Sequence, residues 1–152
     1  MSFTSTVKVL VVDDFEPFRR FVRSTLGKNE TFQIVGEAAD GVDAVCQAEE
    51  LQPDLILLDI GLPALNGIAA ARQIRKLAPK SKIVFVSLES SPDVVQEALR
   101  VGNCGYVLKS EAGDDLLEAV DAVREGKQFV SSGVPALHKF LFVFSTVDIL
   151  ES

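Results

Sequence analysis

The sequence predicts a doubly wound (βα)5 α/β fold, in which one parallel five-stranded sheet is covered by helices on both faces. Short apolar runs alternate with segments of helical periodicity throughout residues 7–123, which is typical of βα repeats. The apolar runs contain few polar residues, as expected for strands that are buried on both faces. The length of 152 residues is that of one ordinary domain.

The first two βα repeats occupy residues 7–53. Val7–Val12 reads VKVLVV and predicts the first strand, because it is β-branched and almost entirely apolar. A helix that ends near Gly27 follows, and Phe32–Gly36 predicts the second strand. Pro53 prevents the second helix from continuing. The residues that form the inner stripes of these helices are Phe18, Phe21, Val22, Thr25 and Leu26 in the first, and Ala44, Val45, Ala48 and Leu51 in the second.

The third and fourth repeats contain the most apolar part of the chain. Leu55–Leu58 is the most apolar run, and we expect it to be the central strand. Ile83–Val86 predicts the fourth strand, which ends at Ser87. The fourth helix begins at Pro92 and is closed by Gly102. The inner stripes are Ile68, Ala71, Ile74 and Ala78 in the third helix, and Val94, Val95, Ala98 and Leu99 in the fourth.

The fifth repeat completes the pattern. Gly105–Leu108 predicts a short strand that ends at Lys109, and a helix follows that ends near Gly126. The inner stripe of this helix is Leu116, Ala119, Val120 and Val123. Residues 127–152 show no further βα repeat. We therefore expect a folded domain over residues 1–130 and a tail of uncertain structure over residues 131–152.

The composition excludes several classes of protein. Acidic residues outnumber basic ones by 22 to 15, and the net charge of -7 opposes binding to nucleic acid and to anionic lipid. No apolar run approaches the roughly 20 residues that span a bilayer. Residues 1–6 lack the pattern of a secretory signal, so we expect a cytoplasmic protein. Cys46 and Cys104 have no CxxC spacing and His138 is the single histidine, which excludes a disulfide framework and the usual zinc sites.

Polar side chains follow four of the predicted strands: Asp13 and Asp14, Asp59, Ser87 and Lys109. Because ligands of open α/β sheets bind beyond the carboxyl ends of the strands, we expect these side chains to lie together. Clustered carboxylates need a cation, and oxygen ligands without His or Cys suit Mg²⁺. An Asp59 carboxylate beside that ion is placed to attack a phosphoryl group, while Lys109 neutralises charge and Ser87 forms a hydrogen bond to the group. The alternative is a structural ion-pair network at the sheet edge.

Four segments in their order and spacing carry a resemblance to a known family. They read VVDD at Val11–Asp14, LLDIGLPALNG at Leu57–Gly67, FVSL at Phe85–Leu88 and GYVLK at Gly105–Lys109. Over residues 7–130 the chain resembles a response-regulator receiver domain of two-component signalling. The resemblance implies a flavodoxin-like sandwich with the strand order 2-1-3-4-5.

The resemblance also implies a signalling switch. Asp59 would be the phosphoacceptor, phosphorylated by a sensor histidine kinase in the presence of Mg²⁺. The implied ligands of Mg²⁺ are Asp13, Asp14, Asp59 and the backbone carbonyl of Gly61. Lys109 and Ser87 would complete the phosphoryl site, and Ser87 and Tyr106 would form the switch that changes an output or dimer surface. The chain would assist only its own phosphorylation and dephosphorylation, and is not expected to be a turnover enzyme.

Three segments, two of which overlap those four, resemble the subfamily of transcription regulators in which a LuxR-type helix-turn-helix follows the receiver. They are LPALNG, the pair Lys109–Ser110 and REGKQFVS. Nineteen residues follow Gly133, too few for that four-helix domain, so we expect no direct DNA binding by this chain. We also expect a homodimer, through the fourth and fifth helices or through the tail, because Phe140–Phe144 is an apolar run that a monomer would have to bury.

Two alternatives remain open at this point. One is a phosphorylation-independent interaction or dimerisation module on the same fold. It is favoured by Leu88, a bulky residue where the family usually has a small one, which we expect to narrow access to the phosphoryl site. The other is a Mg²⁺-dependent phosphatase with an aspartyl-phosphate intermediate, which typically needs a DxD motif. Here Asp13 and Asp14 are adjacent and Phe15 follows, which favours the receiver.

Overall fold

The helices and strands lie close to where the sequence predicts them. The computed structural model describes residues 6–134. Its strands are β1 (Val7–Val12), β2 (Phe32–Ala38), β3 (Leu55–Leu58), β4 (Lys82–Ser87) and β5 (Cys104–Leu108). Its helices are α1 (Glu16–Gly27), α2 (Gly41–Leu51), α3 (Gly67–Leu77), α4 (Pro92–Leu99) and α5 (Ala112–Arg124), with a short 3₁₀ helix η1 (Lys109–Glu111) before α5.

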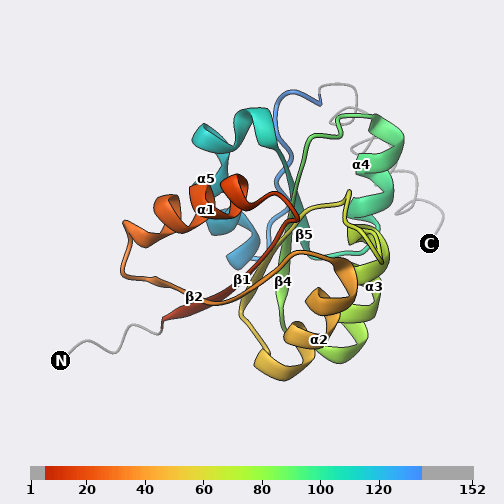
Figure 1. Cartoon of the computed structure of the whole chain (residues 1–152). Coiled ribbons are helices and arrows are strands. Elements are labelled where there is room, and N and C mark those ends of the chain that lie inside the picture. Colours follow the sequence, from red (N-terminus) through yellow and green to blue (C-terminus); the bar gives the residue numbers. More distant parts are fainter. Residues whose placement is uncertain (1–5, 135–152) are drawn as a thin grey trace.

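The five strands form one parallel sheet in the order β2-β1-β3-β4-β5, which confirms the prediction (Figure 1). The most apolar strand, β3, is central as expected. Its last residue, Leu58, pairs with Val12 on β1 and with Phe85 on β4. This register brings the carboxyl ends of β1, β3 and β4 to the same edge of the sheet.

Helices cover both faces of the sheet (Figure 1). α1 and α5 pack on one face, and α2, α3 and α4 pack on the other. Along β1, Val9 and Val11 belong to the core under α1 and α5, whereas Leu10 and Val12 belong to the core under the other three helices. Because alternate residues of a strand face opposite sides, β1 is apolar from Val9 to Val12, where both of its faces are covered, and Lys8 near its start is exposed.

The ends of β2 and α4 differ from the sequence prediction, and β4 and β5 each begin one residue earlier than predicted, at Lys82 and Cys104. β2 extends two residues beyond Gly36, because Glu37 and Ala38 continue to pair with β1 after a shift in register. α4 ends at Leu99, so Gly102 does not close the helix directly. With a φ of 88°, Gly102 instead lies in the turn that leads to β5, where a left-handed backbone favours glycine.

The start of α3 is fixed against the end of β3. The side chain of Asn66 caps α3 by accepting a hydrogen bond of 3.0 Å from the backbone N–H of Ala69. A Cβ atom on Gly67 would lie 1.9 Å from the carbonyl oxygen of Asp59. Only glycine permits this close approach, which holds the loop after Asp59 in place.

The chain after α5 returns along the outer edge of β5. The backbone N–H of Tyr106 donates to the carbonyl of Phe129 at 2.8 Å, and the carbonyl of Tyr106 accepts from the N–H of Ser131 at 3.0 Å. Val130 and Val134 are buried in the core. Both residues therefore pack with the sheet and its helices.

Several expectations concern residues 135–152, which lie outside the described residues. They are the structure of the tail, its apolar run Phe140–Phe144 and the surroundings of His138. Within residues 6–134, none of the helices has the length and apolar character needed to cross a membrane. Cys46 is exposed and Cys104 is buried, and both are free thiols.

Candidate functional site

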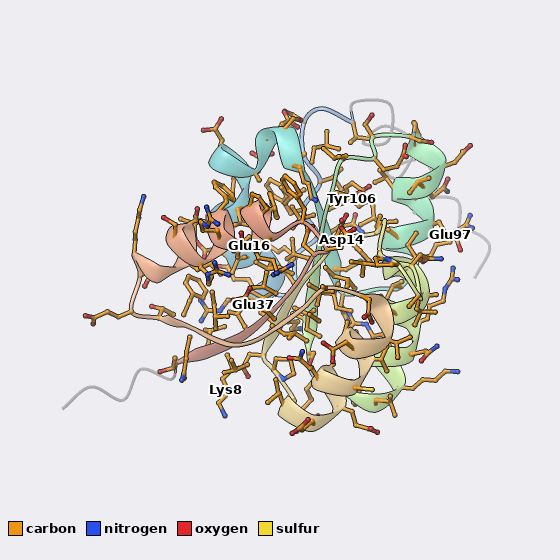
Figure 2. All side chains as sticks on the ribbon, viewed as in Figure 1. Lys8, Asp14, Glu16, Glu37, Glu97 and Tyr106 are labelled. Carbon is orange, nitrogen blue, oxygen red and sulfur yellow. The ribbon has the colours of Figure 1, made fainter. Side chains whose placement is uncertain are left out.

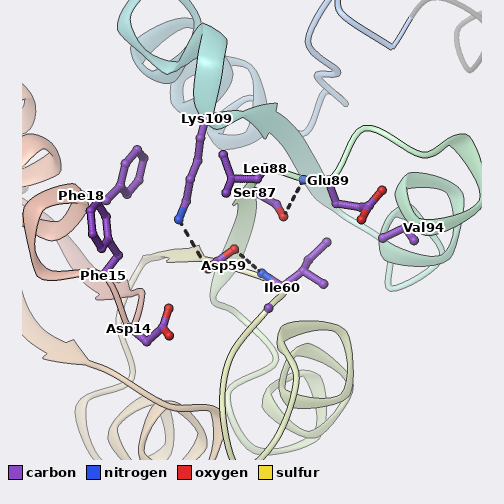
Figure 3. Close-up of a pocket in the computed structure, with 11 residues that line it drawn as sticks. Asp14, Phe15, Phe18, Asp59, Ile60, Ser87, Leu88, Glu89, Val94 and Lys109 are labelled. Atoms are coloured by element: carbon purple, nitrogen blue, oxygen red, sulfur yellow. Dashed lines mark hydrogen bonds and ion pairs between the residues drawn. The ribbon is translucent and has the colours of Figure 1, made fainter.

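A cavity of about 670 Å³ lies at the carboxyl edge of the sheet (Figure 3). It brings together four of the side chains that the sequence places at strand ends: Asp14, Asp59, Ser87 and Lys109. Its other lining residues are Phe15, Phe18, Ile60, Gly61, Leu88, Glu89 and Val94. Asp13, the remaining strand-end residue, is buried and forms an ion pair with Lys109.

Three carboxylates cluster at this site. One oxygen from each of Asp13, Asp14 and Asp59 lies within 4.8 Å of the other two. Asp13 and Asp59 are buried, whereas Asp14 is exposed. The cluster forms because β1 and β3 are neighbours in the sheet and end at the same level.

Asp13 is held through several of its oxygen atoms. Its Oδ1 accepts a hydrogen bond of 2.9 Å from the backbone N–H of Phe15, and its carbonyl accepts one of 2.6 Å from the guanidinium of Arg19. Its Oδ2 lies 2.7 Å from Nζ of Lys109 without the alignment of a hydrogen bond, and accepts none from the described residues. Oδ2 is thus engaged in a close ion pair, but a carboxylate oxygen carries further lone pairs, which are suited to a hard cation.

Arg19 connects the loop between β1 and α1, which carries Asp13 and Asp14, to β2. The carboxylate of Glu37 on β2 accepts a hydrogen bond of 3.0 Å from Arg19 and one of 2.7 Å from Arg23. Arg23 also pairs with Glu16, and Figure 2 shows Glu16 and Glu37 near each other where α1 meets β2. The loop between β1 and α1 is therefore anchored to the sheet by charged side chains.

Lys109 joins two of the carboxylates. Its Nζ lies 2.7 Å from Oδ2 of Asp13 and 3.4 Å from Oδ2 of Asp59. The side chain of Lys109 is only 12% exposed, so water screens these ion pairs weakly. Within the cluster, one ammonium group faces three carboxylates, so negative charge remains.

The ionised form of Asp59 is disfavoured in this environment. Burial raises the pKa of the Asp59 carboxyl above its usual value, and the Asp13 carboxylate raises it further. Lys109 acts in the opposite direction, as does the backbone N–H of Ile60, which donates to Oδ1 of Asp59 at 2.8 Å. A bound cation would oppose both effects by stabilising the Asp59 anion.

Ser87 and Tyr106 meet at the backbone of Glu89. Oγ of Ser87 accepts a hydrogen bond of 3.2 Å from the N–H of Glu89, and the hydroxyl of Tyr106 donates one of 2.6 Å to the carbonyl of Glu89. Tyr106 is fully buried and packs near Phe85, with ring centroids 6.3 Å apart. This burial raises the pKa of Tyr106 to about 12. One loop residue thus links the two side chains that the resemblance assigns to the switch.

Apolar side chains form the rim of the cavity. Leu88 is 79% exposed at this rim, and Phe15 is also exposed there. Leu88 was expected near the site, but the sequence did not single out Phe15 and Phe18 as site residues. Their position in the sequence could have indicated a place at the site, because they follow Asp14 by one and four residues and lie at the start of α1.

Known proteins with similar sequences define the family. The family model of the response regulator receiver domain matches residues 9–121. The response regulator protein VraR from Staphylococcus epidermidis is 38% identical over 121 residues, which cover 80% of this chain and 58% of VraR. The transcriptional regulatory protein DegU from Brevibacillus brevis is 33% identical over 124 residues, which cover 82% of this chain and 52% of DegU. The chain therefore spans little more than half the length of these relatives.

Solved structures show the same fold. A two-component response regulator of the LuxR family from Aurantimonas sp. SI85-9A1 has a TM-score of 0.82 at 26% identity, over 91% of this chain and 99% of that one. The isolated REC domain of RcsB from Salmonella enterica serovar Typhimurium, solved with the phosphomimetic BeF3-, has a TM-score of 0.80 at 25% identity, over 88% and 99% of the two chains. Sequence and structure agree that this chain belongs to the receiver-domain family of two-component response regulators, with LuxR-family regulators among its homologues.

Proposed function

We propose that this chain is a phosphoacceptor switch, in which Asp59 receives a phosphoryl group from a phosphohistidine of a sensor histidine kinase. The observation that carries the proposal is the position of Asp59. It is a buried carboxylate that lines an open cavity, 3.4 Å from Lys109 and clustered with two further carboxylates. Response regulators are signalling proteins rather than classical enzymes, so the phosphoryl group is the signal itself.

The acidic cluster fits Mg²⁺, which receiver domains bind at an acidic pocket. We propose that its ligands are the carboxylates of Asp13, Asp14 and Asp59 and the backbone carbonyl of Gly61, which lines the cavity. The buried Oδ2 of Asp13, which pairs with Lys109 but accepts no aligned hydrogen bond from the described residues, supports this assignment. When bound, Mg²⁺ supplies positive charge that stabilises the Asp59 anion and the oxygens of the phosphoryl group.

The carboxylate of Asp59 is the nucleophile in this proposal. One of its oxygens forms a bond to phosphorus while the bond between phosphorus and the donor imidazole nitrogen breaks, and the imidazole keeps that electron pair. Lys109 offsets the negative charge on the phosphoryl oxygens. The N–H of Ile60 holds Oδ1 of Asp59 in place. Water later attacks the phosphorus of the mixed anhydride, which releases inorganic phosphate and restores the carboxylate.

Ser87 and Tyr106 would carry the change to the surface. The hydroxyl of Ser87 donates a hydrogen bond to a phosphoryl oxygen, which draws this side chain toward Asp59. Because the backbone of Glu89 bonds to both Ser87 and Tyr106, the loop after β4 and the tyrosine move together. The face formed by α4, β5 and α5 then changes, and we propose it as the surface for an output partner or a homodimer. A preference of a few kcal/mol for one arrangement is enough to shift the population.

The direct test is the mass of the intact protein after incubation with acetyl phosphate and Mg²⁺. The wild type should gain one phosphoryl group, whereas Asp59→Asn and a sample with a magnesium chelator should gain none. Asp121→Asn is the matched control, because Asp121 is an exposed carboxylate on α5 outside the cavity. It should gain one phosphoryl group as the wild type does.

The contrary result would favour the phosphorylation-independent interaction module. That result is no gain of mass in the wild type, together with no effect of beryllofluoride on the fluorescence of Tyr106, the only tyrosine in a chain without tryptophan. Leu88→Ala adds one further distinction. If only this variant gains a phosphoryl group, Leu88 blocks access to a site that is otherwise competent.

A further inference from the structure

An aromatic ring lies against the ammonium group of Lys109. Nζ of Lys109 is 4.7 Å from the centroid of the Phe18 ring, within the range of a cation–π interaction. Figure 3 shows Phe18 and Asp59 on different sides of this nitrogen. The ammonium group is therefore held by two carboxylates and by one uncharged ring.

Phe18 is placed by its own packing. It lies in the first turn of α1, directly after Pro17, the second residue of the helix. Its ring packs near Phe21, with centroids 5.5 Å apart, and against the core between α1, α5 and the sheet. The position of the ring therefore does not depend on Lys109, and the ring can act as a fixed support for this side chain.

A lysine at this position needs such a support. Its flexible four-carbon stem means that the place of the ammonium group is set by its partners. Asp13 and Asp59 attract Nζ, but the proposed reaction engages both carboxylates with other groups. The Phe18 ring binds neither Mg²⁺ nor a phosphoryl group, so its attraction to the ammonium group persists. Because Lys109 is largely buried, water weakens this attraction little.

We propose that Phe18 is a positioning residue for Lys109, whose ring keeps the ammonium group within reach of a phosphoryl group on Asp59. The inference rests on the proposed function of Asp59, and Phe18 acts only through the lysine. The competing explanation is that Phe18 merely anchors α1 in the core. In that case the rate of phosphorylation depends on the size of the Phe18 side chain and not on the electron density of its ring.

Stepwise fluorination of Phe18 separates these explanations. Fluorine withdraws electron density from the face of the ring, which weakens the attraction for a cation with little change of shape. Phe18 would be replaced in the full chain by mono-, di-, tri- and pentafluorophenylalanine. The rate of phosphorylation by acetyl phosphate and Mg²⁺ should fall at each step, by about fivefold over the whole series.

The same series at Phe21 is the matched control. Phe21 packs near the Phe18 ring but does not line the cavity. The phosphorylation rate should stay constant as Phe21 is fluorinated. A constant rate across the Phe18 series, or an equal fall in both series, would overturn the proposal.

A second measurement tests the positioning without phosphorylation. ¹⁵N NMR measures the exchange of the Lys109 ammonium protons with water. This exchange should be faster when Phe18 is pentafluorinated, because the ammonium group is held less closely. Unchanged exchange would contradict the role of Phe18 even in a chain that is phosphorylated. Faster exchange in a chain that cannot be phosphorylated would support the positioning and overturn only the proposed function of Asp59.

Discussion

The hydroxyl group of Tyr106 donates a hydrogen bond of 2.6 Å to the backbone carbonyl of Glu89, which ties a fully buried side chain of β5 to the loop that follows β4. The N–H of Glu89 donates to Ser87 at the edge of the phosphoryl site. Tyr106 therefore belongs to the core through its ring and to the candidate switch through its hydroxyl. Its two parts can be tested separately.

Tyr106→Phe removes the hydroxyl and keeps the ring. The variant should lose about 1 kcal/mol of unfolding free energy, because the carbonyl of Glu89 loses its hydrogen-bond partner. Urea denaturation measures this difference. An unfolding free energy equal to that of the wild type would show that the hydrogen bond adds nothing to stability.

The ionisation of Tyr106 should depend on folding. Burial raises its pKa to about 12, against about 10 in the unfolded chain. Its contribution to stability is therefore complete below about pH 10 and is lost as the pH rises through about 12. Because the chain has one tyrosine, the ultraviolet absorbance of tyrosinate reports this group alone. A midpoint near pH 10 in the folded protein would contradict the buried hydroxyl.

Asp59→Asn should be more stable than the wild type at neutral pH. Burial and the Asp13 carboxylate raise the pKa of Asp59, so its ionisation opposes folding. The protonated Asp59 carboxyl favours folding. This contribution to the unfolding free energy is lost as the pH rises above about 4, which is the pKa of the carboxyl in the unfolded chain. The advantage of the variant should therefore be small in acid and grow toward neutrality. Thermal unfolding at several pH values measures it, and equal Tm values at neutral pH would contradict the prediction.

Mg²⁺ should stabilise the wild type but not Asp13→Asn. An ion that binds only the folded state adds about 1.4 kcal/mol to the unfolding free energy at ten times its Kd. Titration of Mg²⁺ against a chelator, with Tm as the readout, measures this gain. Asp121→Asn should respond as the wild type does. An equal rise of Tm in Asp13→Asn would exclude Asp13 as a ligand.

Ser131→Ala should cost about 1 to 3 kcal/mol of unfolding free energy. The buried Oγ of Ser131 accepts from the N–H of Leu108 at 3.0 Å and donates to Asp115 at 2.7 Å, and both partners lose this contact. Ser132→Ala is the control. The exposed hydroxyl of Ser132 donates a long hydrogen bond of 3.3 Å to Glu111, so this variant should change stability by less than about 0.5 kcal/mol. Urea denaturation compares the two variants, and equal losses would contradict the role of Ser131.

The sheet could be predicted because each strand is marked by its own residues. Leu55–Leu58 is apolar throughout, which already indicates a strand covered on both faces, and Asp59 marks its carboxyl end. The clustering of Asp13 with Asp59 then follows from the geometry of parallel strands. The strand order does not follow from any single strand, and it came from the resemblance to the receiver family.

Contacts between distant segments could not be predicted in this way. The contact of Phe18 with Lys109 depends on how α1 is rotated against the sheet, and no local pattern records that rotation. The pairing of residues 129–131 with β5 was missed for a similar reason. This segment lacks the alternation that marks a strand, and its position depends on the edge that Tyr106 offers.

Residues 129–131 occupy the hydrogen-bonding edge that a further strand would need in order to join the sheet. The N–H and carbonyl of Tyr106 and the N–H of Leu108 already have partners, so strand addition at β5 requires this segment to leave first. β2, at the opposite side of the sheet, has no such neighbour within residues 6–134. Unpaired strand edges are where sheets of different molecules join. In the described part of the chain, residues 129–131 therefore protect the β5 edge from edge-to-edge pairing. No backbone segment protects the β2 edge there, although the side chain of Gln47 donates a hydrogen bond of 2.7 Å to the carbonyl of Glu37 on β2.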